Sequence, residues 1–200
     1  MKPALDQFQV NLIRARGLTA TADSLRALTT PAIDLSDVYR ASLVLGVSAL
    51  DYFVHEFVRL GMIEVHRGNR PATDAYLIFK VPLAKVRVGI ANTAEDDWLD
   101  KSIRDAHSWK AFQRPDEIAD AVRLICGAKL WEGVANKIGS DAKAVKARLD
   151  MIVERRNKIA HEADMDPTNP GLQWPIDGVL VRDALDYIEH VAEGIYAVAA

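Results

Sequence analysis

Cysteine is almost absent from this sequence of 200 residues, which contains only Cys126. A single thiol forms neither an internal disulfide nor a thiolate metal cluster, and such usage is typical of a reducing compartment. Long apolar runs are also scarce: each one is too short or too interrupted to span a bilayer, and the first residues lack the pattern of a secretory signal. We therefore expect a cytoplasmic protein with no membrane contact.

The sequence also lacks a large excess of positive or negative charge. The formal net charge is -3, so the chain has no overall basic field, and contact with nucleic acid must come from a local patch. Half of the residues are apolar and 26% are charged, which is ordinary for a globular protein of this length. The sequence predicts a single domain over residues 1–200.

Several common catalytic signatures are missing too. No glycine-rich turn precedes a Lys-Ser or Lys-Thr pair, which excludes a phosphate-binding loop. The stretch that begins with His55 and Glu56 has Arg59 where a zinc protease needs its second histidine. Ser48, Asp51 and His55 share one helical face and cannot form a linear nucleophilic relay, so polar contacts within the bundle or along a groove are expected. We expect no metal and no cofactor.

Apolar residues repeat with a helical period, and no run alternates with period two for long enough to predict a strand. The predicted fold class is therefore all-α. Gly17 is expected to break the first helix and Pro31 to close its segment, while residues 37–65 are apolar on more than one face and should form a central helix. The predicted helices cover residues 5–28, 37–65, 95–110, 115–126, 131–138, 141–163 and 177–196, with shorter pieces between residues 71 and 92.

The best clue to function lies in residues 154–162, ERRNKIAHE, near the end of a predicted helix. Arg156 falls on the apolar stripe of that helix. Because a guanidinium does not lose its proton and is costly to bury without an anion, Arg156 needs a carboxylate or phosphate partner. The stripe contains Val145, Leu149, Ile152 and Ile159.

Helical geometry separates Arg156 and His161, the two candidate catalytic side chains of this segment. Asn157 and His161 face the same way, whereas Arg156 and His161 point about 140° apart. One helix alone makes an awkward site. A two-fold dimer that crosses two copies would gather two arginines and two histidines at one cleft.

The same helix has a local excess of positive charge. It could steer a polyanion, although such a run can also be an ordinary solvated face. With RNA in the cleft, His161 could move the proton of the ribose 2'-hydroxyl or of the leaving oxygen, while Arg156 offsets phosphate charge. Asn157 could hold the histidine or a phosphate oxygen, and Lys158 and Arg155 could contact the flanking backbone. Such chemistry needs no metal and leaves DNA uncut.

Two other interpretations remain open. The chain could be a non-catalytic helical module that binds RNA, a nucleotide or a protein. In a purely structural role, Arg156 would pair with Asp51 or Glu56, and His161 would cap the helix end near its negative dipole.

The four tryptophans are scattered singly along the sequence, which favours core or interface packing over base stacking. They are Trp98, Trp109, Trp131 and Trp174.

At these residues the chain resembles the HEPN family of small all-helical proteins. The family signature is an arginine, a polar residue, three variable positions and a histidine near a helix end, and residues 156–161 fit it. The segments 40–51, 156–164 and 115–119 resemble the RiboL-PSP-type branch of this family. The resemblance touches about two-thirds of the chain, and its six-residue motif is moderately specific.

The resemblance implies a HEPN-like helical bundle with additional short helices and a metal-independent endoribonuclease that cuts single-stranded RNA at a site formed across a homodimer. It implies catalytic roles for Arg156 and His161, with Asn157 as their polar companion. We add Asp51 and His55 as candidate supporting residues on the second long helix. Family members often act as toxins or in phage defence, so an antitoxin or regulatory protein is a candidate partner beside RNA.

Overall fold

The computed structural model describes residues 1–30, 32–91 and 96–200, and all regular elements in these ranges are helices. The predicted all-α class is therefore confirmed for the described chain. The predictions for Pro31 and for a helix start at Glu95 lie outside the described residues. The helices are α1 (Lys2–Leu28), α2 (Ser36–His66), α3 (Asp74–Leu77), α4 (Leu83–Ala91), α5 (Asp97–His107), α6 (Pro115–Val122), α7 (Leu130–Ile138), α8 (Ala142–Glu162) and α9 (Gly178–Ala199).

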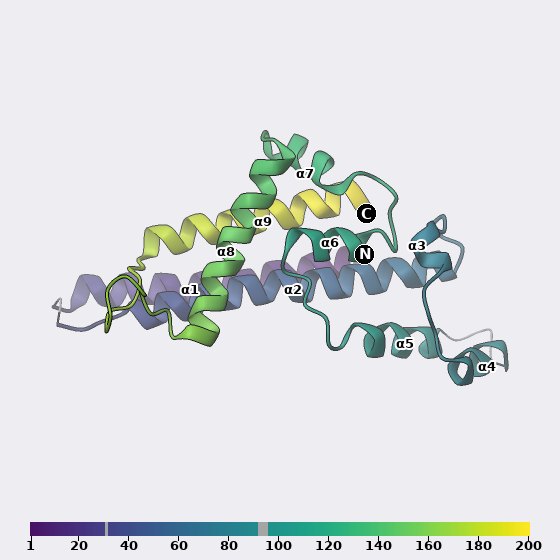
Figure 1. The fold of residues 1–200 in the computed structure, drawn as a ribbon, viewed down its shortest axis with the longest axis horizontal. Coiled ribbons are helices and arrows are strands. Elements are labelled where there is room, and N and C mark those ends of the chain that lie inside the picture. Colours follow the sequence, from purple (N-terminus) through teal and green to yellow (C-terminus); the bar gives the residue numbers. More distant parts are fainter. Residues whose placement is uncertain (31, 92–95) are drawn as a thin grey trace.

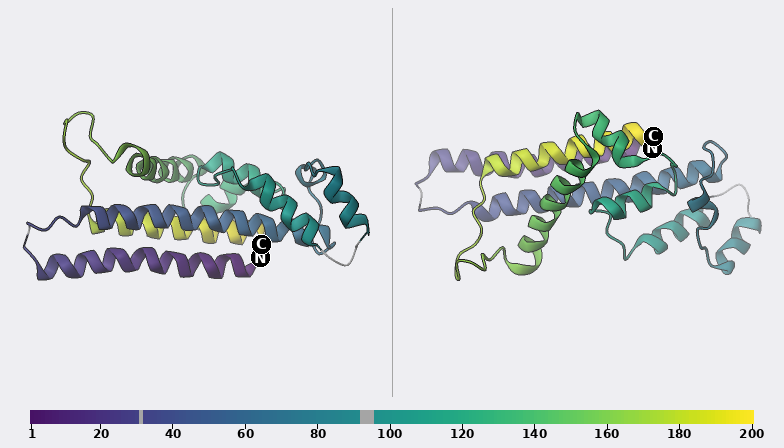
Figure 2. Two further views of the ribbon diagram at one scale, coloured as in Figure 1. Left: turned by 90° about the horizontal axis from the view of Figure 1, so that it is seen from below. Right: turned by 45° about the horizontal axis from the view of Figure 1, so that its top comes forward.

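Three long helices, α1, α2 and α9, lie side by side and form the body of the molecule (Figure 1, Figure 2). Helix α8 crosses this body, and α7 packs against α8 and α9. Helices α4 and α5 lie toward the C-terminal end of α2, far from the turn that joins α1 to α2 (Figure 1). The two helices that carry the predicted site residues, α2 and α8, are thus in direct contact.

Helix α2 is the central helix, as its apolar pattern predicts. Its fully buried side chains face several neighbours, and they include Leu43, Val47, Leu50, Phe53, Val54 and Phe57. By length and composition α2 is apolar enough to cross a membrane, which differs from our sequence-based expectation. More than half of its most apolar 18-residue window is buried inside the protein, as expected for a core helix.

Gly17 in α1 and Gly46 in α2 differ in their effect on the structure. Helix α1 runs through Gly17 without the predicted break. Glycine in a helix interior costs only about 1 kcal/mol, and the buried side chains of Phe8 and Leu12 hold α1 to the core. Gly46 on α2 has a packing role, because a Cβ atom there would collide with the Leu185 side chain of α9. Gly46 therefore permits the close approach of α2 and α9.

Candidate functional site

The predicted motif lies in the last two turns of α8, which begins after the Asp141 cap and ends at Glu162. Val145, Leu149 and Val153 are buried on its packed face. Arg156 continues this face, as predicted: the residue is partly buried, and its Nε atom is buried without a hydrogen-bond partner. Its Nη1 donates to Asn157 Oδ1 at 3.0 Å. Within the described chain, no carboxylate pairs with Arg156.

The alternative pairing of Arg156 with Asp51 or Glu56 is wrong. Asp51 Oδ1 accepts the backbone N–H of Phe112 at 2.5 Å. Glu56 accepts hydrogen bonds from Arg59 of α2 and Arg104 of α5. These carboxylates are engaged because α5 and the segment after it pack onto α2, a contact that the sequence did not reveal.

His161 is exposed in the last turn of α8. The helix end is closed by the backbone: the N–H groups of Ala163 and Asp164 both turn back to the carbonyl of Lys158. Ala163 and Asp164 adopt left-handed conformations, with φ of 51° and 57°. The burial of Arg156 and the exposure of His161 agree with the predicted divergence of these two side chains. In one protomer they do not converge.

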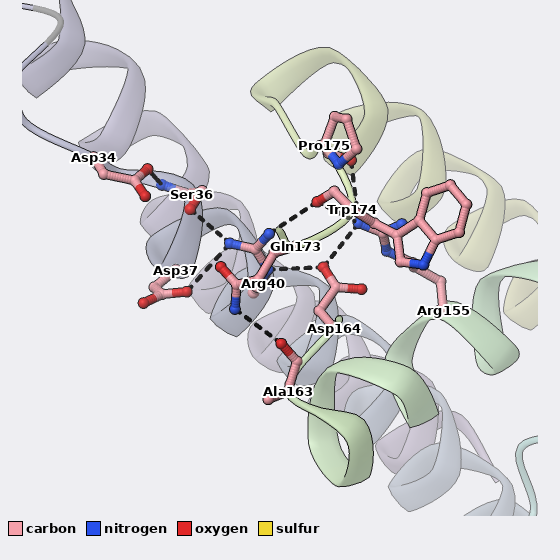
Figure 3. A network of polar contacts seen from close by, with 10 residues as sticks. All are labelled: Asp34, Ser36, Asp37, Arg40, Arg155, Ala163, Asp164, Gln173, Trp174 and Pro175. Atoms are coloured by element: carbon pink, nitrogen blue, oxygen red, sulfur yellow. Dashed lines mark hydrogen bonds and ion pairs between the residues drawn. The ribbon is translucent and has the colours of Figure 1, made fainter. Parts of the chain in front are cut away.

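Asp164, immediately beyond the motif, is the centre of a buried polar network (Figure 3). Its side chain is fully buried, and its Oδ2 accepts from Arg40 Nε of α2 and from Arg155 Nη2 of α8, each at 2.8 Å. The same two guanidiniums also donate to the carbonyl of Trp174, at 2.9 Å and 3.1 Å. We call this Arg40–Asp164–Arg155 group the clamp.

The clamp changes our view of Arg155. We predicted that this side chain contacts RNA, but its guanidinium is directed into the protein at Asp164 (Figure 3). Burial lowers the pKa of Arg155, Asp164 raises it, and the nearby charge of Arg40 lowers it further. An arginine that is held by a buried carboxylate and two carbonyls has little capacity left for a phosphate, so we omit Arg155 from the proposed RNA contacts.

The clamp also fixes the segment that follows α8. The Trp174 N–H donates to the carbonyl of Asp164 at 2.9 Å, and Gln173 Nε2 donates to the carbonyl of Ala163 at 2.9 Å. An isolated bridge joins Met165 to Gln173. Residues 163–175 therefore fold back on themselves and bring Trp174 next to α8.

Lys158 lies beside this tryptophan, with its Nζ 5.9 Å from the centre of the Trp174 ring. Both residues line a hollow of about 590 Å³, which we call the Trp174 pocket. Its lining residues are Arg114, Asp150, Met151, Glu154, Arg155, Lys158 and Trp174. The RNA contact that we predicted for Lys158 stays a prediction, and the pocket places a tryptophan beside it.

Asp51 and His55 lie in a second group on α2. The His55 Nε2 atom is 3.8 Å from Asp51 Oδ1, and the His55 ring centre is 6.2 Å from that of His107 on α5. The three residues line a hollow of about 290 Å³. Within the described chain, no hydrogen bond or ion pair links Asp51 or His55 to Arg156 or His161, so the structure does not join the two groups directly.

His107 is a residue of this second group that sequence reasoning missed. The residue is 2% exposed, and its Nε2 is buried without a hydrogen-bond partner in the described chain. Burial lowers the pKa of His107 from 6.5 to about 4, and the charges of Lys110 and His55 contribute in the same direction. His107 is therefore neutral at physiological pH.

Comparison with protein-family models, with curated proteins and with solved structures found no match. The described chain is an all-α protein in which Arg156 and His161 lie near the end of one helix, α8. The HEPN resemblance therefore stays a prediction that rests on the motif and its position.

Proposed function

We propose that this protein is a metal-independent endoribonuclease that cuts single-stranded RNA at a site formed by two protomers. The observation that carries the proposal is Arg156, whose partly buried guanidinium has no carboxylate partner in the described chain. A buried or partly buried guanidinium favours an anion, and a phosphodiester is one that fits its geometry. An exposed histidine, His161, lies five residues further along the same helix.

The reaction follows from the two side chains. The imidazole of His161 from one protomer takes the proton of the ribose 2'-hydroxyl, and the 2' oxygen forms a bond to phosphorus. The bond from phosphorus to the 5' oxygen breaks, and the second imidazole gives its proton to that oxygen. Arg156 offsets the negative charge that builds on the phosphate. The products are a 2',3'-cyclic phosphate and a 5'-hydroxyl.

Asn157 has a supporting role in this proposal. Its Oδ1 accepts from Arg156 Nη1 at 3.0 Å, and we had expected it to hold the histidine or a phosphate oxygen. The contact instead orients the guanidinium. The side-chain amide of Asn157 is left to donate to a phosphate oxygen.

A second candidate is a helical module that binds RNA without cutting it. The divergence of Arg156 and His161 by about 140° favours this function for a monomer, because a single chain presents only one of them to a given phosphate. A toxin or phage-defence role, with an antitoxin or regulatory protein as partner, is the setting that the HEPN resemblance suggests for the nuclease.

The test is to incubate purified protein with labelled single-stranded RNA and DNA of the same sequence, with and without a chelator. We expect cutting of RNA alone, resistance to the chelator and a cyclic phosphate at the new 3' end. His161→Ala should abolish cutting without changing the melting temperature, because the side chain is exposed. RNA that stays intact with wild-type dimer would leave the binding module as the better description.

A further inference from the structure

Trp174 does not have the environment that the sequence suggested for it. Packing was expected, and Trp131 fits that expectation because it is 8% exposed and its Nε1 donates to the carbonyl of Pro115 at 3.0 Å. Trp174 is only partly buried and lines the Trp174 pocket. Met151, which is 69% exposed, lies at the same hollow. An indole and an exposed thioether give this hollow two surfaces suited to a flat aromatic ligand.

The backbone of Trp174 is held in place before any ligand binds. Its carbonyl accepts from Arg40 (Figure 3) and from Arg155 of the clamp. Its N–H donates to the carbonyl of Asp164. Three backbone hydrogen bonds to buried or partly buried groups fix the position of this residue in an otherwise exposed segment. A fixed platform loses little conformational entropy when a ligand binds, which favours affinity.

The charges around the pocket suit a phosphate beside the flat ligand. Lys158 lies near the Trp174 ring and forms no ion pair within the described chain. Arg114 pairs with Glu154 at 2.8 Å and with Asp150 at 3.6 Å, and all three side chains are 41% to 50% exposed. Exposed pairs of this kind contribute little stability and are readily exchanged. Lys158, and Arg114 after such an exchange, can therefore contact a phosphate.

The pocket lies on the His161 face of α8, away from the packed face of Arg156. At about 100° per residue, His161 projects within about 20° of Glu154 and about 60° of Lys158. Along the helix axis the separations are about 10 Å and 5 Å, at about 1.5 Å per residue. A nucleic-acid strand that contacts His161 therefore reaches the Trp174 pocket with a neighbouring nucleotide.

We propose that the Trp174 pocket is a base-binding subsite, in which one unpaired nucleobase of the RNA stacks on the indole of Trp174 while its phosphate contacts Lys158. The subsite rests on the proposed function only in that RNA is the substrate. Stacking uses the base and not the ribose, so single-stranded DNA should occupy the same pocket without being cut. The pocket thus contributes to affinity, whereas His161 and Arg156 contribute to the chemical step.

The test measures binding separately from cutting. All proteins carry His161→Ala, so that the RNA stays intact, and the dissociation constant of a labelled single-stranded RNA of roughly 10 nucleotides is followed by fluorescence anisotropy. Trp174→Ala and Trp174→Leu should each raise the dissociation constant roughly 5- to 150-fold, whereas Trp174→Phe should retain most of the affinity. The matched control is Trp109→Ala, since Trp109 is 79% exposed and does not line this pocket.

Salt dependence gives a second measurement on the same proteins. Lys158→Gln should lower the slope of log affinity against log salt by about one phosphate contact. A single-stranded DNA of the same sequence should compete with the RNA, and Trp174→Ala should weaken that competition. Melting temperatures of all variants report whether the fold around the clamp is kept, and Trp174→Phe preserves the test if the smaller side chains disturb it.

The outcomes separate this proposal from the nuclease proposal. Cutting by wild-type protein together with unchanged affinity and KM in Trp174→Ala would overturn the subsite and leave the nuclease intact. Loss of affinity in Trp174→Ala, with wild-type protein that never cuts RNA, would support the subsite and overturn the nuclease. Absence of any binding to RNA or DNA would overturn the subsite, and a protein ligand would then be the better occupant.

Discussion

The burial of His107 could not be predicted from the sequence. This residue lies in a charged helix, α5, where an exposed position would be expected, yet its ring contacts those of His55, Phe79 and Phe112. These partners come from α2 and from segments before and after α5. Helical periodicity describes one element at a time, so a contact among four segments could not be predicted from it.

The burial of His107 predicts a pH dependence of stability. Its pKa is about 4 in the folded protein against an ordinary value of 6.5, so the unfolded chain binds a proton that the folded one does not. Above pH 6.5 the titration of His107 does not change the free energy of unfolding. As the pH drops toward about 4, the free energy of unfolding falls by up to about 3 kcal/mol. Urea unfolding from pH 7 to pH 4 measures the decrease.

The variant His107→Leu should flatten this pH profile, while the exposed His190→Gln should keep the wild-type slope. A His107→Leu protein that loses stability with acid as steeply as the wild type would contradict the assignment.

Arg155 and Arg156 are neighbours in sequence with different surroundings, and only one of them could be predicted. The apolar stripe of α8 correctly placed Arg156 on the packed face. The position of Arg155 depends on Asp164, which reaches it only because Ala163 and Asp164 turn the chain in left-handed conformations. Non-glycine residues adopt such conformations uncommonly, so the sequence offered no sign of this turn.

At the scale of elements, the helical period of the apolar residues predicted most of the helices. The predicted helix 141–163 is observed as α8, Ala142–Glu162, and the predicted 177–196 as α9, Gly178–Ala199. The Asp141 and Asp177 side chains cap these helices, each at the first residue of its predicted range. The clamp could not be predicted, because it joins α2, α8 and the segment after α8 through residues more than 100 positions apart.

The clamp links α2 to α8 and should contribute strongly to the free energy of unfolding. Replacing the fully buried Asp164 by asparagine leaves the charges of Arg40 and Arg155 without their shared carboxylate, and a loss of about 3–5 kcal/mol in unfolding free energy is expected. The control is Asp183→Asn, which removes an exposed pair with Arg148 and should cost at most about 1 kcal/mol. Urea unfolding measures both, and equal losses would show that the clamp is no stronger than a surface pair.

At the scale of the molecule, α1, α2 and α9 form a body across which α8 lies (Figure 1). The proposed reaction needs a second copy, because the Arg156 and His161 of one α8 diverge. The productive pair must then come from opposite protomers.

Mixing two inactive variants tests this requirement. Arg156→Ala and His161→Ala homodimers should each be inactive, yet about half of the dimers in an equal mixture contain one arginine and one histidine on opposite chains. These dimers should regain cutting at a reduced rate, because the single imidazole still takes the 2'-hydroxyl proton while water supplies the proton of the leaving oxygen. A mixture of Arg156→Ala with the double variant should stay inactive, because it contains no Arg156. RNA cleavage assays after subunit exchange measure the recovery, and an inactive first mixture would contradict the shared site.

The first turns of α2 are held from two sides: Arg40 meets Asp164, and Gly46 lies against Leu185 of α9. Inserting or deleting one residue between these positions would rotate one contact by about 100° relative to the other, so both could not form. Length variation among any related sequences should therefore avoid residues 40–46 and concentrate outside the helices.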